Sequence, residues 1–364
     1  MSPARRAWEG QSDLPALLRR CHDPALFADV PPDEALRRMA YLYAPPAEGE
    51  RPLSLRSRAL ALYVPFAQRG RFPAGFRLCA NVYTACAHAC AYCYISGYVP
   101  DPARPREKPG FLRSLERDLA DLRALGLPPV PLHVSNSTDG LQEAMERPLG
   151  QALALLRRIA EERDLFSSVP ILTKNPARLT MPEYLEPLKA LPQAVVEVSL
   201  TFWNDALRRH VEPGAPSVAS RVEAVRRLRA EGVRVTLRVD PLFPRDPLPA
   251  AFFGSPTVAD YGAQAAHTWS DLEHLVSLAA DTGCERVVIS AMKVMCGRYH
   301  DRRFRAEWEL LYAAAQGGRA RARGFAFRLP EAYIREHLFA PVVELGRERG
   351  IEVVHCTRNL FTTQ

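Results

Sequence analysis

Short apolar segments and longer amphipathic segments alternate from residue 77 to residue 292. The apolar segments are rich in β-branched residues and are expected to form strands; they span 77–84, 130–136, 169–173, 194–200, 233–239 and 286–292. The segments between them carry apolar residues at three- and four-residue spacing, as amphipathic helices do, and two of them end at Gly232 and Gly283. A parallel neighbour is reached only through a crossover, so six such units predict an α/β fold with a parallel sheet.

The handedness of the crossovers narrows this prediction further. Right-handed crossovers repeated six times curl a sheet into a barrel or part of one. No Gly-rich G-x-G-x-x-G turn follows any of the strands, which disfavours a doubly wound dinucleotide-binding sheet. We therefore expect a partial (β/α)6, TIM-like barrel over residues 76–300, with its chemistry in the loops after the strands.

Two further segments flank the expected barrel. Residues 1–75 are Pro-rich and lack strand alternation, which predicts a helical and irregular N-terminal extension. Residues 301–364 contain two helical patterns, at 305–315 and 331–350, and the apolar segment 351–356. We expect this C-terminal segment to complete the side of the barrel or to close its mouth.

Composition limits the class of protein. No apolar run is long enough to span a membrane, and the first residues have no apolar core of a secretory signal, so we expect a cytoplasmic protein. Its eight cysteines are then reduced, and clustered ones suggest a metal or cluster site. The net charge of +7 would suit nucleic acid, but the basic residues are interleaved with acidic ones on the helices, which is typical of a solvated face.

Three cysteines stand close together directly after the first strand. Cys86, Cys90 and Cys93 have the spacing C-x3-C-x2-C. Three thiolates can hold three irons of a 4Fe–4S cluster and leave the fourth iron open, whereas an electron-transfer cluster takes four cysteines. The alternatives are a zinc site with His88 as fourth ligand, or a group of buried thiols. Zinc sites more often combine two separated knuckles, which favours the cluster.

The cysteine motif, with the aromatic Tyr92 before its last cysteine, resembles the signature of the radical S-adenosylmethionine (SAM) superfamily. The string CAHACAYCY is similar to the spore photoproduct lyase-like branch. The similarity continues through STDGLQ, ILTKNP, VEVSLT, the EPGAPS…R…RRLRAEGV segment and RVDPLFP, over about residues 77–245. The resemblance implies a partial barrel, a 4Fe–4S cluster and S-adenosylmethionine. It also implies cleavage of the cofactor to a 5′-deoxyadenosyl radical, which abstracts hydrogen from a substrate, and a small reductant protein such as flavodoxin or ferredoxin.

The resemblance also implies which residues contact S-adenosylmethionine. Most of them fall in the expected loops or at strand ends, where polar groups suit an ammonium, a carboxylate or a ribose. These cofactor-binding candidates are Tyr92, Tyr94, Ser137, Thr138, Asp139, Lys174, Ser199, Arg221 and Asp240. Core packing of the tyrosines, a helix-capping turn over 135–139 and a helix-surface ion pair for the arginine are the structural alternatives.

One position departs from the lyase pattern. Spore photoproduct lyase returns a hydrogen atom from a cysteine, and the matching position here is Asn136, which predicts that this chain does not repair that lesion. Cys296, after the sixth strand, is an alternative hydrogen donor, and Cys284, Cys296 and Cys356 are candidates for a second cluster or metal. The substrate class stays open between nucleic acid, peptide and small metabolite. The alternative function is a non-catalytic iron–sulfur or zinc protein that senses or binds nucleic acid.

Overall fold

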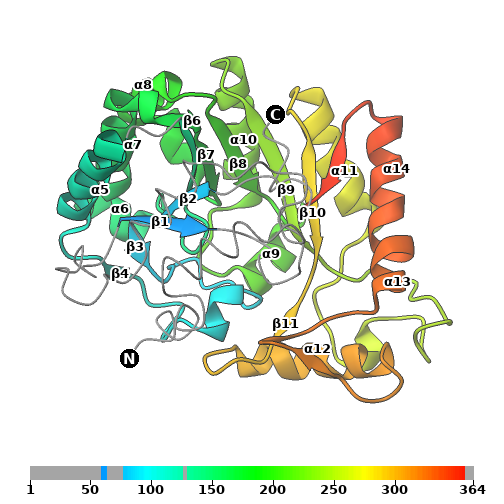
Figure 1. Cartoon of the computed structure of the whole chain (residues 1–364). Coiled ribbons are helices and arrows are strands. Elements are labelled where there is room, and N and C mark those ends of the chain that lie inside the picture. The colour runs from blue at the N-terminus through cyan, green and yellow to red at the C-terminus, as the bar shows by residue number, and fades with distance from the viewer. Residues whose placement is uncertain (1–58, 64–76, 126–128, 357–364) are drawn as a thin grey trace, which may run out of the picture.

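Nine strands pair into one curved sheet in a computed structural model that describes residues 59–63, 77–125 and 129–356 (Figure 1). Its order is β1-β2-β5-β7-β8-β9-β10-β14, with β6 beside β5. The strands are β1 Leu60–Tyr63, β2 Arg77–Ala80, β5 Val130–Val134, β6 Phe166–Ser168, β7 Pro170–Thr173, β8 Val195–Ser199, β9 Val235–Leu242, β10 Val287–Ala291 and β14 Val353–His355. All neighbours are parallel except β1 and β2, which confirms the six expected strands and the partial α/β barrel.

Strand β1 is the exception because it lies in the segment expected to be helical and irregular. It pairs antiparallel with β2, with Leu60 opposite Ala80. The carboxylate of Asp118 accepts hydrogen bonds from the backbone amides of Ala59 and Leu60, at 2.8 and 2.9 Å. Four residues are too few to show an alternation in the sequence, so this strand was not predicted. The other residues of 1–75 lie outside the described part of the chain.

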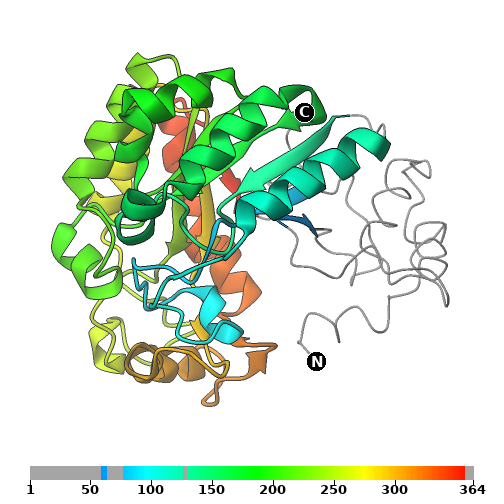
Figure 2. The same cartoon turned by 90° about the vertical axis from the view of Figure 1, so that its left-hand side faces the viewer.

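Helices range around the outside of the curved sheet (Figures 1 and 2). They are α5 Phe111–Leu125, α6 Glu143–Leu149, α7 Gln151–Glu161, α8 Pro182–Ala190, α9 Asp205–Val211, α10 Val218–Ala230, α11 Trp269–Asp281, α12 Arg302–Ala314, α13 Glu331–Tyr333 and α14 Ala340–Glu348, with a π-helical turn at Ile334–Phe339. Gly232 and Gly283 follow α10 and α11 with φ of +76° and +67°, the left-handed conformation in which helices commonly end. At its start α11 has a capping box between Thr268 and Asp271.

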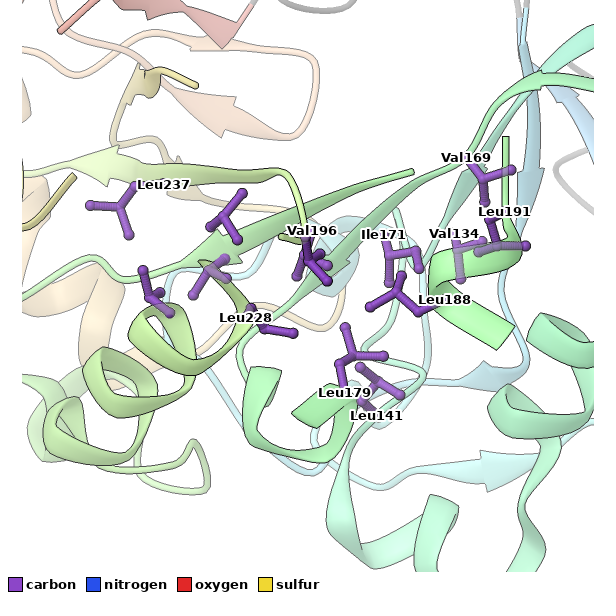
Figure 3. Close-up of a cluster of buried hydrophobic side chains, with 14 of the residues drawn as sticks. Val134, Leu141, Val169, Ile171, Leu179, Leu188, Leu191, Val196, Leu228 and Leu237 are labelled. Carbon is purple, nitrogen blue, oxygen red and sulfur yellow. The ribbon is translucent and has the colours of Figure 1, made fainter. Parts of the chain in front are cut away.

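Two hydrophobic clusters hold these layers together. The larger one fills the space between the sheet and the outer helices, and Figure 3 shows Ile171, Val196 and Leu237 of the strands meeting Leu188 and Leu228 of α8 and α10. A smaller cluster contains Phe202, Phe243, Trp308 and Tyr333 and joins the loops after β8 and β9 to α12 and α13. The C-terminal region is thus packed on the loops that follow the barrel strands.

Residues after 300 also extend the sheet itself. Strand β14 pairs in parallel with β10, with Ile289 opposite His355. A small antiparallel sheet of order β11-β13-β12 lies beside α12, and β3 pairs with β4. These short strands are β3 Tyr83–Thr84, β4 Arg106–Glu107, β11 Val294–Met295, β12 Ala322–Arg323 and β13 Ala326–Phe327. Among the described residues, every helix is too short or too polar to cross a membrane.

Candidate functional site

The carboxyl ends of the parallel strands open into a cavity of about 1760 Å³. Its lining includes residues at the ends of β5, β7, β8, β9 and β10, together with His355 of β14. Ligands bind at this edge in parallel α/β folds. The volume exceeds the roughly 300–1,000 Å³ of a typical small-molecule pocket, so the cavity has room for more than one ligand.

The three clustered cysteines lie on one wall of this cavity. Cys86, Cys90 and Cys93 are partly buried free thiols, and all three line the cavity. Their loop turns sharply, since Ala85 and Ala89 adopt φ of +63° and +50°, a conformation that non-glycine residues seldom take. Such backbone persists where the surrounding structure holds it in place.

The segment between α9 and α10 supplies that support. The amide of Ala91 donates to the carbonyl of Val211 at 2.9 Å, and the amide of Gly214 donates to the carbonyl of His88 at 3.1 Å. A Cβ on Gly214 would lie 2.0 Å from the carbonyl oxygen of Ala87, so only glycine allows this approach. The cysteine loop is therefore braced by residues more than a hundred positions away in the sequence.

His88 is not placed as a zinc ligand. Its Nε2 lies 2.9 Å from Asp139 Oδ2, and its Nδ1 lies 3.2 Å from the carbonyl oxygen of Gly214. Both ring nitrogens are thus engaged by the protein. Within the described residues, no three His, Cys, Asp or Glu side chains converge as a single metal ion requires. The zinc alternative does not fit this arrangement.

A larger iron–sulfur group fits the donor set better. Burial raises the pKa of all three cysteine thiols, so the thiolates need a strong positive charge to stabilise them. Bound metal provides such a charge and deprotonates coordinating thiols. The three soft sulfur donors line one cavity but do not converge on a single ion. This arrangement suits an iron–sulfur cluster.

The carboxylate of Asp139 accepts hydrogen bonds from several other groups of the protein. Besides His88, its carboxylate accepts hydrogen bonds from the Thr173 hydroxyl at 2.9 Å and from the amides of Lys174 and Leu141 at 2.6 and 2.9 Å. Burial alone would raise its pKa, but the hydrogen bond from His88 and the backbone amides outweigh it and lower the pKa. Asp139 lines the cavity, yet its main effect is to tie β5, β7 and the cysteine loop together.

Two polar residues precede Asp139 in the same turn; Thr138 supports the cysteine loop, and Ser137 lies at the cavity. Thr138 donates its hydroxyl proton to the carbonyl of Ala85, which supports the strained turn before Cys86. Ser137 lies 3.3 Å from the hydroxyl of Tyr94, whose ring is about half exposed at the cavity. The turn lies at the cavity, whereas α6 begins after Gln142 with no side-chain cap, so the helix-capping alternative is wrong.

Lys174 and Tyr92 meet at a buried carboxylate that the sequence did not single out. Glu212 is fully buried, and its Oε1 lies 3.1 Å from Lys174 Nζ and also accepts the hydroxyl proton of Tyr92. Its Oε2 lies 2.8 Å from Arg221. Burial would raise the pKa of Glu212, but Lys174 and Arg221 outweigh it and hold the pKa well below its usual range. Glu212 is the first residue of the EPGAPS motif, which was part of the resemblance, but no role was predicted for it.

Arg221 lies behind the cavity wall and not on the helix surface. Its side chain is fully buried, and its guanidinium donates to Glu212 and to the carbonyls of Ser199 and Pro216, the latter two at 3.0 Å. It is not among the cavity-lining residues, whereas Ser199 is. The helix-surface ion pair considered for Arg221 is wrong, because α10 turns this residue inward toward β8.

Charged residues also fill the inside of the barrel. Arg238 Nη1 lies 3.0 Å from Glu197 Oε2, and His133 Nε2 lies 3.4 Å from the same oxygen. Arg238 also pairs with Asp240, whose carboxylate accepts the hydroxyl proton of Ser290. Charged residues within apolar strand segments were the signal for this array, since a strand residue that is charged and buried needs an internal partner.

The remaining cysteines separate in space. Cys356 lines the cavity, and its sulfur accepts a hydrogen bond from Arg238 Nη2 at 3.0 Å. Cys296 packs against the smaller hydrophobic cluster and is not among the cavity-lining residues. Cys284 precedes β10, so it lies at the opposite end of the sheet from Cys356, which follows β14. The hypothesis of a second metal site formed by these three cysteines is wrong for this reason.

Comparison with known proteins agrees with this geometry. Residues 80–246 match the family model of the radical SAM superfamily. This matched segment, somewhat less than half of the chain, is a radical SAM domain. The domain indicates that the protein is an enzyme, and the superfamily implies S-adenosylmethionine and a 4Fe–4S cluster. No curated protein matches the chain in sequence.

Several solved structures are similar to this chain, each with a TM-score below 0.5. A mutant of spore photoproduct lyase is 10% identical over 89% of this chain and 84% of its own, with a TM-score of 0.49. Another, with bound AdoMet and dinucleoside spore photoproduct, is 10% identical over 76% and 75%, with a TM-score of 0.48. SuiB of Streptococcus suis, bound to its precursor peptide SuiA, is 12% identical over 75% and 46%, with a TM-score of 0.43.

Proposed function

We propose that Cys86, Cys90 and Cys93 hold a 4Fe–4S cluster and that this radical SAM enzyme cleaves S-adenosylmethionine in the adjoining cavity. The observation that carries the proposal is the placement of three free thiols on one braced loop at the carboxyl ends of the parallel strands. When bound, such a cluster supplies the electron that splits the sulfur–carbon bond of S-adenosylmethionine and starts radical chemistry on a substrate.

The protein's own residues then have distinct tasks in binding the cofactor. Lys174 and Ser199 line the cavity and are proposed to bind polar groups of S-adenosylmethionine, with Tyr94 forming part of the wall. Glu212 holds the Lys174 ammonium from behind, at 3.1 Å. Arg221 is proposed as a positioning residue, because it reaches the cavity only through Glu212 and Ser199.

Cleavage of S-adenosylmethionine tests the proposal. The full-length chain is reconstituted with iron and sulfide without oxygen, reduced with dithionite and incubated with S-adenosylmethionine, and 5′-deoxyadenosine is measured by chromatography. We expect about four irons per chain and formation of the product. Replacing Cys86, Cys90 or Cys93 by Ala is expected to reduce the product to background, because each change removes one of the three thiolate ligands.

A matched substitution separates cluster loss from general damage. Cys284→Ala removes a buried thiol at the far end of the sheet and is expected to retain both iron and cleavage. A chain that binds zinc and produces no 5′-deoxyadenosine would refute the proposal. Equal loss in Cys284→Ala and Cys90→Ala would also count against it.

Repair of spore photoproduct is not part of the proposed function. Asn136 occupies the position of the lyase's hydrogen-donating cysteine, and its side-chain oxygen accepts a hydrogen bond from Asn81 at 2.7 Å. An amide is a poor hydrogen-atom donor compared with a thiol. We propose a different substrate, and a small electron-transfer protein such as flavodoxin or ferredoxin as the reductant. Repair of lesion-containing DNA by the reconstituted chain would contradict this.

A further inference from the structure

Three basic residues form a row across the end of the small sheet. In this sheet Val294 of β11 and Ala322 of β12 both stand opposite Phe327 of β13. Moving one residue beyond these pairs, the same antiparallel register brings together the next position on each of the three strands. Those positions are Lys293, Arg328 and Arg321, and all three residues line the cavity. We call them the cation row.

One side chain holds the two arginines of the cation row in place. Gln316 donates from Nε2 to the carbonyl of Arg328 at 2.7 Å, and its Oε1 accepts from the amide of Arg321 at 2.8 Å. Gln316 lines the same cavity. The two backbones are therefore fixed to each other, which keeps the origins of the two arginine side chains close together.

The three exposed side chains of the cation row have no carboxylate within ion-pair distance among the described residues. Lys174 and Arg238 have ion-pair partners, whereas Lys293, Arg321 and Arg328 form no ion pair with other residues in the described part of the chain. Like charges opposite each other on neighbouring strands are destabilising. Partial burial and then the charge of Arg328 lower the pKa of Lys293, and together they outweigh the opposite effect of Asp240. A bound anion would relieve this repulsion.

A second polar group in the same cavity also lacks a partner. His133 is only 5% exposed and lines the cavity, and its Nδ1 has no hydrogen-bond partner among the described residues. A buried polar atom left without a partner costs free energy, so it indicates a ligand or water that completes it. His133 and the cation row thus give two separate indications of a polar ligand in the same cavity.

We propose that the cation row binds a phosphomonoester group of the substrate; this rests on the proposed function, because it places that substrate in the cavity of the cysteine loop. Arginine guanidinium groups present paired donors that match phosphate oxygens. The three positive charges of the cation row match a phosphomonoester, which carries close to two negative charges at neutral pH, better than a singly charged diester.

Isothermal titration calorimetry on the full-length reconstituted chain tests the cation row, with phenyl phosphate as the probe. Arg328→Gln and Lys293→Gln are each expected to weaken binding at least about tenfold, since each removes a charged hydrogen-bond donor. Arg319→Gln is the matched control, because Arg319 is exposed on the same loop but does not line the cavity. It is expected to change the dissociation constant less than about twofold, as screened surface charges do.

Three results would overturn the proposal: no binding of phenyl phosphate, equal weakening by Arg319→Gln and Arg328→Gln, or equally tight binding of the diester methyl phenyl phosphate or of benzoate. Formation of 5′-deoxyadenosine is measured in the same samples. Phosphate binding that depends on the cation row without cofactor cleavage would refute the proposed radical function alone. Cleavage without phosphate binding would refute the cation row alone.

Discussion

At the scale of single residues, the site depends on a buried carboxylate that touches no ligand. Glu212 receives Lys174 and Tyr92 on one oxygen and Arg221 on the other. Two buried cations close to a single carboxylate are tolerable only while that carboxylate is charged. The cofactor-binding role predicted for Lys174 therefore depends on a residue of the EPGAPS motif to which the sequence assigned no role.

Removing the charge of Glu212 should be costly. We expect Glu212→Gln to lower the free energy of unfolding by about 3–5 kcal/mol, because Lys174 and Arg221 then remain buried without a counter-charge. Urea denaturation measures this loss. Glu309→Gln breaks a partly exposed pair with Arg305 on α12 and should cost no more than about 1 kcal/mol. Equal losses in the two variants would contradict the role assigned to Glu212.

At the scale of elements, the cysteine loop packs closely against the segment between α9 and α10. The cysteine loop lies after β2, and the segment that supports it runs between α9 and α10. Gly214 marks the closest approach, where any side chain would meet the backbone of Ala87 and His88. The helices are anchored by their own caps, such as Ser217 at the start of α10, so this support does not shift easily.

A single methyl group at this contact should disturb the cysteine loop. We expect Gly214→Ala to push the loop away, to lower the bound iron well below that of the unmodified chain and to cost about 1–3 kcal/mol of stability. Iron content after reconstitution and thermal unfolding measure both effects. Gly254→Ala is the control, because the nearest atom to its added Cβ is 3.9 Å away. Full iron loading of Gly214→Ala would show that the loop does not need this contact.

At the scale of the whole molecule, charges inside the barrel link strands that are far apart in the sequence. Glu197 of β8 and Arg238 of β9 pair across neighbouring strands, and His133 of β5 contacts the same carboxylate. Cys356, after β14, is held by Arg238, so the last strand joins the same array. The interior of the partial barrel is therefore polar, and at the carboxyl ends of the strands it opens into the cavity.

This interior should make the fold sensitive to acid. Burial would raise the pKa of Glu197, but Arg238 and His133 outweigh it and lower the pKa from 4.5 to about 2. Since the folded pKa is below the unfolded one, Glu197 contributes stability above about pH 4.5, which is lost as the pH falls toward 2. Urea unfolding across this range measures the slope, and Glu197→Gln should flatten it. An unchanged slope would show that Glu197 is not the group responsible.

The sequence by itself determined the fold class and the position of the cysteine loop. Apolar periodicity and helix-ending glycines are local along the chain, and so is the C-x3-C-x2-C spacing, which is why six strands and their helices were predicted correctly. Strand β1 was missed because four residues carry too little pattern. The roles of the predicted cofactor-binding residues remain predictions, although most of those residues line one cavity.

Only the tertiary structure decided which charges meet. Glu212 finds Lys174 and Arg221, and the register of the small sheet aligns the cation row, through contacts between distant segments. The same packing places Cys356 at the cavity and turns Cys296 away from it. A charged residue in an apolar strand segment indicates from the sequence that it needs a partner inside the protein. Which residue becomes that partner depends on the tertiary packing, because the energy of an ion pair depends on the distance between the charges and on their burial.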